Sequence, residues 1–304
     1  MDKVSVIINT RNEEENLPKA INSVKGVADE IVVVDMMSED ETARVAKKLG
    51  ARVYEHEKTG YVEPARNFAI SKTLGNWILI LDADEEVPRT LGAKLKKIIK
   101  NPTADYFRIP RKNIIFGKWM KHSRWWPDYN IRFFKKGYVI WNEVIHSIPM
   151  TQGIGADLPV KEELAIIHYN YNSIEQYLER MNRYTSVQAK TLIEGKHKFI
   201  WKDLISRPVS EFLSRYLAGE GYKDGLHGLA ISLLQAFSEL IVYLKVWQAE
   251  KFLEQAISTK EVEAEMRRTF KETDWWLKEI SIKSKGFIAS LPTRIARSLS
   301  NKND

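Results

Sequence analysis

The chain has 304 residues, of which 44% are hydrophobic, 11% aromatic and 29% charged. These fractions, with only 10 prolines, are typical of a folded protein and exclude a disordered one. The absence of cysteine excludes disulfide scaffolds, thiolate metal sites and cysteine nucleophiles. The length suffices for one large domain or two smaller ones, and the first residues lack the apolar core of a signal peptide, so we expect a cytoplasmic protein.

The net charge of +7 comes from one segment of the chain. Residues 89–136 contain 14 Lys and Arg but only Asp105 and Asp128 as acids, which gives this segment a local charge of +12. The rest of the chain carries a net charge of −5. A segment this basic can meet nucleic acid, anionic lipid or a phosphorylated substrate, and composition does not choose among them.

Short apolar runs alternate with helical patterns over the first hundred residues. We expect strands over 4–8, 31–34, 51–54 and 77–81, separated by helices over 18–26, 38–50, 64–74 and 88–100. The sequence from Ser38 to Glu41 fits a capping box that begins the second of these helices. Strands rich in Val and Ile that alternate with helices of about ten residues predict an α/β fold, with a mostly parallel sheet covered by helices on both faces.

Polar side chains follow directly after three of the predicted strands. Residues 9–13 follow the first strand, Asp35 the second, and Asp82 with Asp84 the fourth. In such sheets ligands bind beyond the carboxyl ends of the strands. Asp35 and Asp82 could instead cap the helices that follow them, but the agreement of three strand ends favours a binding site. Two carboxylates at i and i+2 can hold Mg²⁺ or Mn²⁺ bridged to a diphosphate.

The second half of the chain is predicted to be helical. Residues 105–146 have the pattern of extended segments and loops, and an amphipathic helix follows over 173–194, where Ser173 and Gln176 form a capping box. Beyond it no segment has a strand pattern. The charged segment 259–282 predicts another helix, and the tail from 281 to 304 carries +4, which suits anionic lipid or a solvated end.

An apolar stripe runs from Leu226 to Trp247 at helical spacing. Its length would nearly span a bilayer, but Glu239 near its middle argues against a span exposed to lipid. Three alternatives therefore stay open: packing within the protein or a dimer, docking on a membrane surface, and a true span.

Several stretches resemble the family 2 glycosyltransferases of the GT-A fold. They are residues 6–13 (VIINTRNE), 30–35 (EIVVVD), 65–69 (ARNFA) and 81–85 (LDADE). Further stretches, at 125–134 and 168–185, resemble the branch that contains bacterial lipopolysaccharide-core β-glucosyltransferases. The resemblance, from about Val4 to Trp247, implies a Rossmann-like GT-A catalytic domain over 1–170. A helical extension over 171–250, for packing or membrane-surface docking, and a charged helix with a basic amphipathic tail over 251–304 would follow.

The resemblance also implies an activity and a donor site. The activity is an inverting transfer of a hexose, with glucose as the suggested sugar, from a nucleotide-diphosphate sugar to a saccharide acceptor of a lipid-linked glycan or lipopolysaccharide core. The residues assigned to the nucleotide-sugar are Thr10, Arg11, Glu13, Asp35, Arg66 and Asp82.

Asp84, Asp82 and His146 are the implied ligands of a Mg²⁺ or Mn²⁺ ion. Asp84 matches the more direct ligand, whereas His146 could equally be a structural or acceptor-loop residue. We expect His168 to be structural.

Sugar transfer also needs a base that takes the proton of the acceptor hydroxyl. Asp128 is the expected base, because it is one of two acids in the basic segment and lies among aromatic residues. An ion pair with Arg124 or Arg132 is the alternative role for Asp128, and Glu143 is the alternative base. Aromatic faces stack on sugar rings and arginines bind phosphate or carboxylate. The expected acceptor-binding residues are Arg124, Trp125, Trp126 and Arg132.

Other functions remain as alternatives. The same fold could transfer a sugar to a polyprenyl phosphate, and an inactive relative could act as a scaffold. A nucleic-acid-binding protein would use the basic segment, but the chain contains no recognisable nucleic-acid module, so we expect no such partner. We expect a cytoplasmic enzyme with peripheral contact at the inner face of the membrane, and the oligomeric state is not fixed by the sequence.

Overall fold

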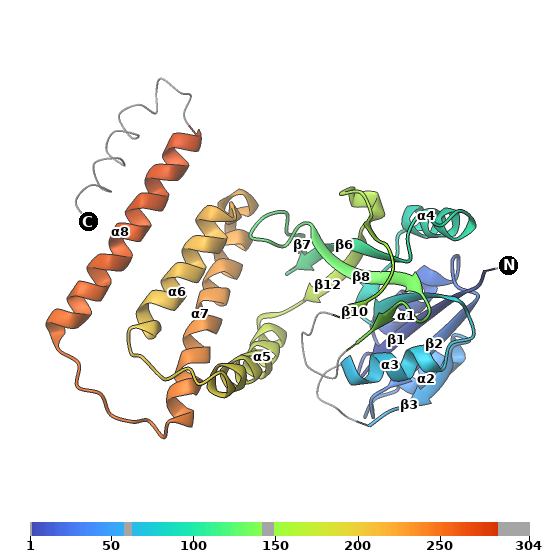
Figure 1. Cartoon of the computed structure of the whole chain (residues 1–304), viewed down its shortest axis with the longest axis horizontal. Helices are drawn as coiled ribbons and strands as arrows, with labels where there is room; N and C mark the ends of the chain where they lie inside the picture. The colour runs from blue at the N-terminus through green and yellow to red at the C-terminus, as the bar shows by residue number, and fades with distance from the viewer. Residues whose placement is uncertain (1, 58–62, 142–148, 285–304) are drawn as a thin grey trace. The chain divides into compact units, whose positions relative to one another are not determined.

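The computed structural model describes residues 2–57, 63–141 and 149–284, and the chain divides into two compact units (Figure 1). The first unit comprises Met1–Ile114 and Trp126–Asn170. The second unit comprises Ile115–Trp125 and Tyr171–Asp304. The chain therefore passes from one unit to the other three times, and residues 115–125 belong with the helices although they lie between two parts of the first unit.

The first unit is built on a sheet that begins with four parallel strands. In sheet order these are β3 (Arg52–Glu55), β2 (Glu30–Asp35), β1 (Val4–Thr10) and β4 (Trp77–Asp82). Helices α1 (Leu17–Val24), α2 (Thr42–Lys48) and α3 (Glu63–Ser71) connect them.

Every residue of β1 is buried, and the strand packs on both of its faces. Val6 and Ile8 pack in one core cluster with Ile21 of α1, whereas Ile7 packs in another with Ala69 of α3. Alternate side chains of a strand point to opposite faces, so an apolar run of this kind needs cover on both sides. The predicted α/β fold with a mostly parallel sheet and helices on both faces is confirmed.

The sheet continues beyond β4 with antiparallel strands. In order these are β8 (Asp128–Lys135), β6 (Tyr106–Ile115), β12 (Ile166–Tyr171) and β5 (Glu85–Glu86). The register between β6 and β8 contains a shift at Phe107 and Arg108 and places Arg111 opposite Asp128. The short strands are β7 (Lys118–Trp119), β9 (Val139–Ile140), β10 (Met150–Thr151) and β11 (Gly155–Asp157).

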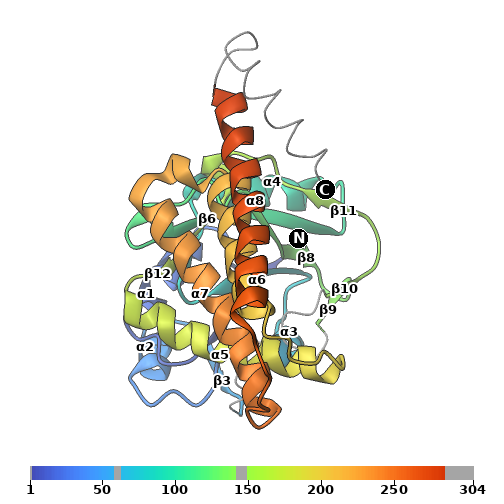
Figure 2. The same ribbon diagram turned by 90° about the vertical axis from the view of Figure 1, so that its left-hand side faces the viewer.

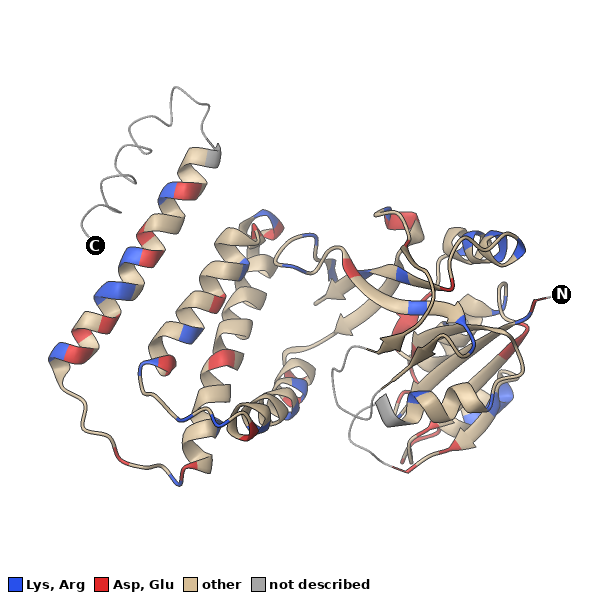
Figure 3. Ribbon diagram, in the orientation of Figure 1, with Lys and Arg blue, Asp and Glu red and all other residues tan. Residues whose placement is uncertain are grey.

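Helix α4 (Arg89–Lys100) is strongly basic, with one arginine, four lysines and no acidic residue. Leu91, Leu95 and Ile98 are buried at helical spacing. The four lysines of α4 are exposed, and Figure 3 colours several turns of this helix as basic. The basic excess of this helix is therefore a solvated face and is not needed to hold the core together.

From Ile174 onward, the described part of the second unit is helical, and its residues 115–125 contain the short strand β7. Its long helices are α5 (Ile174–Glu194), α6 (Asp203–Phe212), α7 (Gly225–Ala249) and α8 (Thr259–Ser284), with single turns at Leu213–Ala218 and Gly221–Asp224. Helix α7 packs against both α5 and α6 (Figure 2). The predicted cap of α5 is confirmed, because the Ser173 hydroxyl accepts a hydrogen bond of 3.2 Å from the N–H of Gln176.

The capping box predicted at Ser38 is wrong. Helix α2 begins at Thr42 and has no side-chain cap at its N-terminus. Ser38 instead donates its hydroxyl to one carboxylate oxygen of Asp35 and its N–H to the other, at 3.1 Å. Asp35 is only 4% exposed, and a buried carboxylate needs hydrogen-bond donors more than an exposed helix end does.

Helix α7 belongs to a segment, Gly221–Ala249, that is long and apolar enough to cross a membrane by length and composition. Core helices of proteins in water pass the same test, and 33% of its most apolar window is buried in this structure. Ile231 and Val246 are fully buried, whereas Leu226 and Leu233 are exposed. Glu239 lies in the same helix, and burial together with the neighbouring Glu211 carboxylate raises its pKa.

Candidate active site

The polar ends of β1, β2 and β4 lie side by side at one edge of the sheet. In the parallel register Asn9 is paired with Val34 on one side and with Asp82 on the other. Thr10 is paired with Asp35. The strand-end residues that the sequence placed at a common edge are therefore neighbours in the structure.

Two buried side chains at this edge have no hydrogen-bond partner among the described residues. Asn9 is 7% exposed and neither atom of its amide is bonded, and the hydroxyl of Thr10, which is 2% exposed, is also without a partner. A buried polar group without a partner costs free energy. Such groups are retained where a ligand completes their bonds, so this part of the edge has the character of a binding site.

Arg11 and Glu13 follow Thr10 in the loop after β1. Arg11 forms an ion pair of 3.1 Å with Glu39, and Glu13 accepts a hydrogen bond of 2.7 Å from the amide of Asn16. The Glu13 contact lies within the loop, whereas the Arg11 contact joins it to the loop after β2. This is where the structure places these two residues of the predicted donor site.

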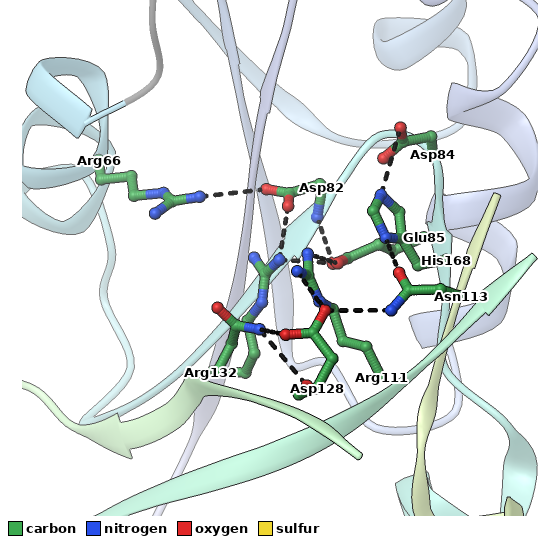
Figure 4. A network of polar contacts seen from close by, with 10 residues as sticks. Arg66, Asp82, Asp84, Glu85, Arg111, Asn113, Asp128, Arg132 and His168 are labelled. Atoms are coloured by element: carbon green, nitrogen blue, oxygen red, sulfur yellow. Dashed lines mark hydrogen bonds and ion pairs between the residues drawn. The ribbon is translucent and has the colours of Figure 1, made fainter. Parts of the chain in front are cut away.

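Asp82 ends β4 and lies between two arginines (Figure 4). Its carboxylate oxygens are 3.4 Å from Nη2 of Arg66 and 2.5 Å from Nη2 of Arg132. Burial alone would raise the pKa of Asp82, but the two guanidinium charges hold it well below its usual range. Asp82 is therefore ionised, and its side chain is 27% exposed, which leaves it within reach of a ligand.

Arg132 lies almost entirely inside the first unit and contacts two carboxylates. Its side chain is 4% exposed, and Nη2 also lies 2.7 Å from Oε1 of Glu85, which is fully buried. Burial and the nearby Asp82 carboxylate raise the pKa of Glu85. The guanidinium group of Arg132 thus compensates two carboxylates, and its acceptor-binding role stays a prediction.

Asp128 begins β8 and is bound by β6. Arg111 donates to Oδ2 of Asp128 through Nε and Nη2, at 2.9 and 2.6 Å, and the amide of Asn113 donates to the same oxygen at 3.1 Å. Burial would raise the pKa of Asp128, but the Arg111 charge and these hydrogen bonds hold it below its usual range. The ion pair considered from the sequence thus forms with Arg111, and Arg124 and Arg132 do not take part. Asp128 remains 27% exposed.

Asp84 and His168 face each other next to this network. Oδ2 of Asp84 is 3.7 Å from Nε2 of His168, and Nδ1 of His168 is 2.7 Å from Oδ1 of Asn113 (Figure 4). The side chains are 12% and 9% exposed. Within the described residues no group of three or more acidic or histidine side chains could hold a metal ion. His146 and Glu143 lie outside the residues that the structure describes.

The predicted acceptor residues are divided between the two units. Trp126 belongs to the first unit, whereas Arg124 and Trp125 belong to the second. In the second unit Arg124 forms an ion pair of 3.3 Å with Glu211, and the guanidinium group of Arg215 lies 5.7 Å from the ring of Trp125. The acceptor role of these residues stays a prediction.

The sequence of the chain was compared with known proteins. The family described as Glycosyl transferase family 2 matches residues 5–154. An uncharacterized glycosyltransferase of Rickettsia typhi is 31% identical over 81% of this chain and 87% of its own length. The lipopolysaccharide core biosynthesis glycosyltransferase LpsC of Rhizobium meliloti is 24% identical over 81% of this chain and 92% of its own.

Solved structures were compared as well. Residues 1–349 of S. aureus TarS align with a TM-score of 0.42 at 16% identity, over 80% of this chain and 91% of that one. Glucosyl-3-phosphoglycerate synthase of Mycobacterium tuberculosis, in complex with Mn²⁺, uridine diphosphate and its product, aligns with a TM-score of 0.32 at 24% identity, over 36% and 44%.

Proposed function

The chain belongs to glycosyl transferase family 2, and we propose that it is a metal-dependent, inverting enzyme that moves a hexose from a nucleotide-diphosphate sugar to a saccharide acceptor. The observation that carries the proposal is the sheet edge at which buried, unpartnered polar groups lie beside two carboxylates. The unpartnered groups belong to Asn9 and Thr10, and the two carboxylates to Asp82 and Asp84. The amide and hydroxyl groups there can hydrogen-bond a nucleotide, and the carboxylates can hold a metal ion bound to the diphosphate.

The donor would be held by the ends of the parallel strands. The amide of Asn9 and the hydroxyl of Thr10 can exchange hydrogen bonds with a base or ribose, and Asp35 can accept from a ribose hydroxyl. Arg66 lies at the same edge, 3.4 Å from Asp82, and its positive charge suits the diphosphate. These roles agree with the positions that the family resemblance implied for Thr10, Asp35 and Arg66.

Asp84 and His168 fit a divalent cation. A carboxylate oxygen and an imidazole nitrogen are both ligands of Mn²⁺, and their separation of 3.7 Å is too long for a hydrogen bond but compatible with two ligands of one ion. When bound, the ion would neutralise charge that develops on the leaving diphosphate. We therefore propose His168, which the sequence indicated as structural, as the histidine ligand.

Asp128 is the proposed base. The oxygen of an acceptor hydroxyl attacks the anomeric carbon of the donor sugar from the side opposite the diphosphate, and the bond from this carbon to the diphosphate oxygen breaks. The diphosphate leaves with the electron pair, and the hydroxyl proton moves to Asp128. Oδ2 of Asp128 is bonded to Arg111 and Asn113. Within the part of the chain that the structure describes, Oδ1 accepts one bond, of 3.2 Å from Asn130, so Oδ1 can receive the proton.

We propose a saccharide of a lipid-linked glycan or lipopolysaccharide core as the acceptor, and glucose as the sugar. Similarity to LpsC, whose name places it in lipopolysaccharide core biosynthesis, supports the acceptor class. The basic excess of residues 89–136 suits an anionic acceptor and a membrane surface with anionic lipids, where the enzyme would act.

The donor proposal can be tested by thermal unfolding with nucleotide-diphosphate hexoses, with and without Mn²⁺. A donor at 100 times its dissociation constant stabilises the folded state by about 2.7 kcal/mol, so the true donor should raise the melting temperature by several degrees, and more with Mn²⁺. Asp84→Asn should abolish the Mn²⁺-dependent part, whereas Asp157→Asn, a matched change at a surface ion pair, should leave it intact. A chain that responds to no donor would contradict the proposal.

A further inference from the structure

Asn113 is the side chain that joins the proposed base to the proposed metal ligand. It lies on β6 and is 0% exposed. Its Nδ2 donates to Oδ2 of Asp128 at 3.1 Å, and its Oδ1 is 2.7 Å from Nδ1 of His168. One amide thus contacts two residues that would act on opposite ends of the reaction.

The carboxylate of Asp128 determines which way this amide points. An ionised carboxylate only accepts hydrogen bonds, so the NH₂ group of Asn113 must face Asp128 and the carbonyl oxygen must face His168. The carbonyl oxygen in turn only accepts, so Nδ1 of His168 must be the nitrogen that carries a proton. In a neutral imidazole ring this leaves the lone pair on Nε2.

That lone pair faces a carboxylate. Nε2 of His168 lies 3.7 Å from Oδ2 of Asp84, which is beyond hydrogen-bond distance. A nitrogen lone pair and a carboxylate oxygen repel each other unless a cation lies between them. Metal-binding histidines are commonly oriented in this way, through a hydrogen bond that the second ring nitrogen donates to a neighbouring acceptor.

We propose that Asn113 is a positioning residue that holds His168 in the Nδ1–H tautomer, so that Nε2 is presented to a divalent cation beside Asp84, while the other end of the same amide orients Asp128. This inference rests on the proposed function for the presence of the cation. Its consequence is that metal binding and the orientation of the base depend on one buried side chain that contacts neither substrate.

The tautomer can be read directly by ¹⁵N NMR of the histidine rings in metal-free protein at about pH 8, where an ordinary imidazole is neutral. The wild-type chain should show a proton on Nδ1 of His168, with His168→Gln used to assign the signal. Asn113→Ala should move the proton to Nε2, the position preferred by an unconstrained side chain. A wild-type ring protonated on Nε2, or no change in Asn113→Ala, overturns the inference.

The effect on the metal site can be measured separately by titrating Mn²⁺ and following the electron paramagnetic resonance signal of the free ion. Asn113→Ala should weaken Mn²⁺ binding by about 10- to 100-fold. Asn130→Ala is the matched control, because Asn130 also donates its amide to Asp128, at 3.2 Å, and has no hydrogen bond to His168. It should leave Mn²⁺ affinity unchanged, and an equal loss in both variants overturns the inference.

Asn113→Asp keeps the measurement informative if the alanine variant does not fold. The carboxyl group of aspartate can still accept the hydrogen bond from Nδ1 of His168, so Mn²⁺ affinity should stay close to that of the wild type, and a loss as large as that of the alanine variant counts against the inference. If the wild-type chain binds no Mn²⁺, the metal dependence of the proposed function fails. If the Asn113→Ala variant binds Mn²⁺ as tightly as the wild type, the proposed metal dependence stands and the proposed role of Asn113 fails.

Discussion

The parallel and antiparallel halves of the sheet edge differ in whether their buried polar groups have partners within the protein. In the parallel half, the amide of Asn9 and the hydroxyl of Thr10 are buried without hydrogen-bond partners among the described residues. In the antiparallel half, the carboxylate of Glu85 is bound by Arg132 of β8, and that of Asp128 is bound by Arg111 of the neighbouring strand β6. Neutral groups at the end of β1 are thus left without partners, whereas the carboxylates, which cost more to bury, are compensated by arginines.

This difference indicates how the two halves would work. Unpartnered groups gain their bonds only when a ligand arrives, so the parallel half would contribute to donor affinity. Groups that are already bonded hold their orientation before the ligand arrives, so the antiparallel half would contribute to the rate of transfer. Substitutions in the two halves should therefore have different effects on binding, rate and stability.

The largest expected effect is on the rate. Asp128→Asn keeps the size of the side chain but removes the proton acceptor, so kcat should fall by about 10²- to 10⁴-fold, with donor affinity little changed. Initial rates at saturating donor and a separate donor titration measure the two quantities. A variant that keeps its rate and loses donor affinity would reverse the assignment of the two halves.

The next effect is on stability. Arg132→Met leaves the buried carboxylates of Asp82 and Glu85 without their shared cation, so the free energy of unfolding should fall by about 3–5 kcal/mol. Arg108→Met removes a pair with Asp157 whose side chains are 50% and 42% exposed, and it should cost less than about 1 kcal/mol. Urea unfolding measures the free energy of unfolding of both variants. Equal losses would show that the buried network does not contribute more to stability than the surface pair.

Two buried threonines, Thr10 and Thr42, should contribute to different properties, the first to donor affinity and the second to stability. Thr10→Val removes a hydroxyl that has no partner among the described residues, so donor affinity should fall about tenfold, which is about 1.4 kcal/mol. The ligand-free protein should keep its stability. Thr42 is as buried, but its hydroxyl accepts from the N–H of Glu13 at 2.8 Å. Thr42→Val should therefore cost about 1 kcal/mol of stability. Calorimetric melting and donor titration distinguish the two results.

The smallest effect is on pH dependence. Because the pKa of Asp128 is lower in the folded state than in an unfolded chain, its ion pair with Arg111 stabilises the protein above about pH 4 and this stabilisation is lost as the pH falls. The difference in unfolding free energy between the wild type and Asp128→Asn should be largest near neutral pH and shrink in acid. Urea unfolding at about pH 7, 5 and 3.5 tests this, and a difference that grows in acid has the wrong sign.

The parallel half of the edge could be predicted from the sequence because its signals are local. Runs of Val and Ile fix strands β1, β2 and β4, and in a parallel sheet the residues that follow such strands must meet at one edge. The positions of Asp35 and Asp82 follow from this rule and need no knowledge of side-chain packing. The capping box at Ser38 failed since the same hydroxyl had a buried carboxylate within reach.

The antiparallel half could not be predicted in the same way, because it depends on a register between distant strands. The pairing of β6 with β8, including its irregularity, decides that Arg111 meets Asp128. One signal was present: Asp128, Asn130 and Arg132 alternate along a strand, as do Arg111 and Asn113, and alternate residues share a face. That pattern places these residues on a common face without saying which of them pair.

Residues 115–125 limit where the chain can be cut into separate fragments. They leave the first unit after Ile114 and return to it at Trp126. Within the second unit, Asp224 at the start of α7 accepts hydrogen bonds from the N–H groups of Lys121 and His122, at 3.2 and 2.9 Å. A fragment that stops at Asn170 would keep this segment but lose what holds it, so the helices cannot be cut off, or exchanged for those of a relative, at a single point in the chain.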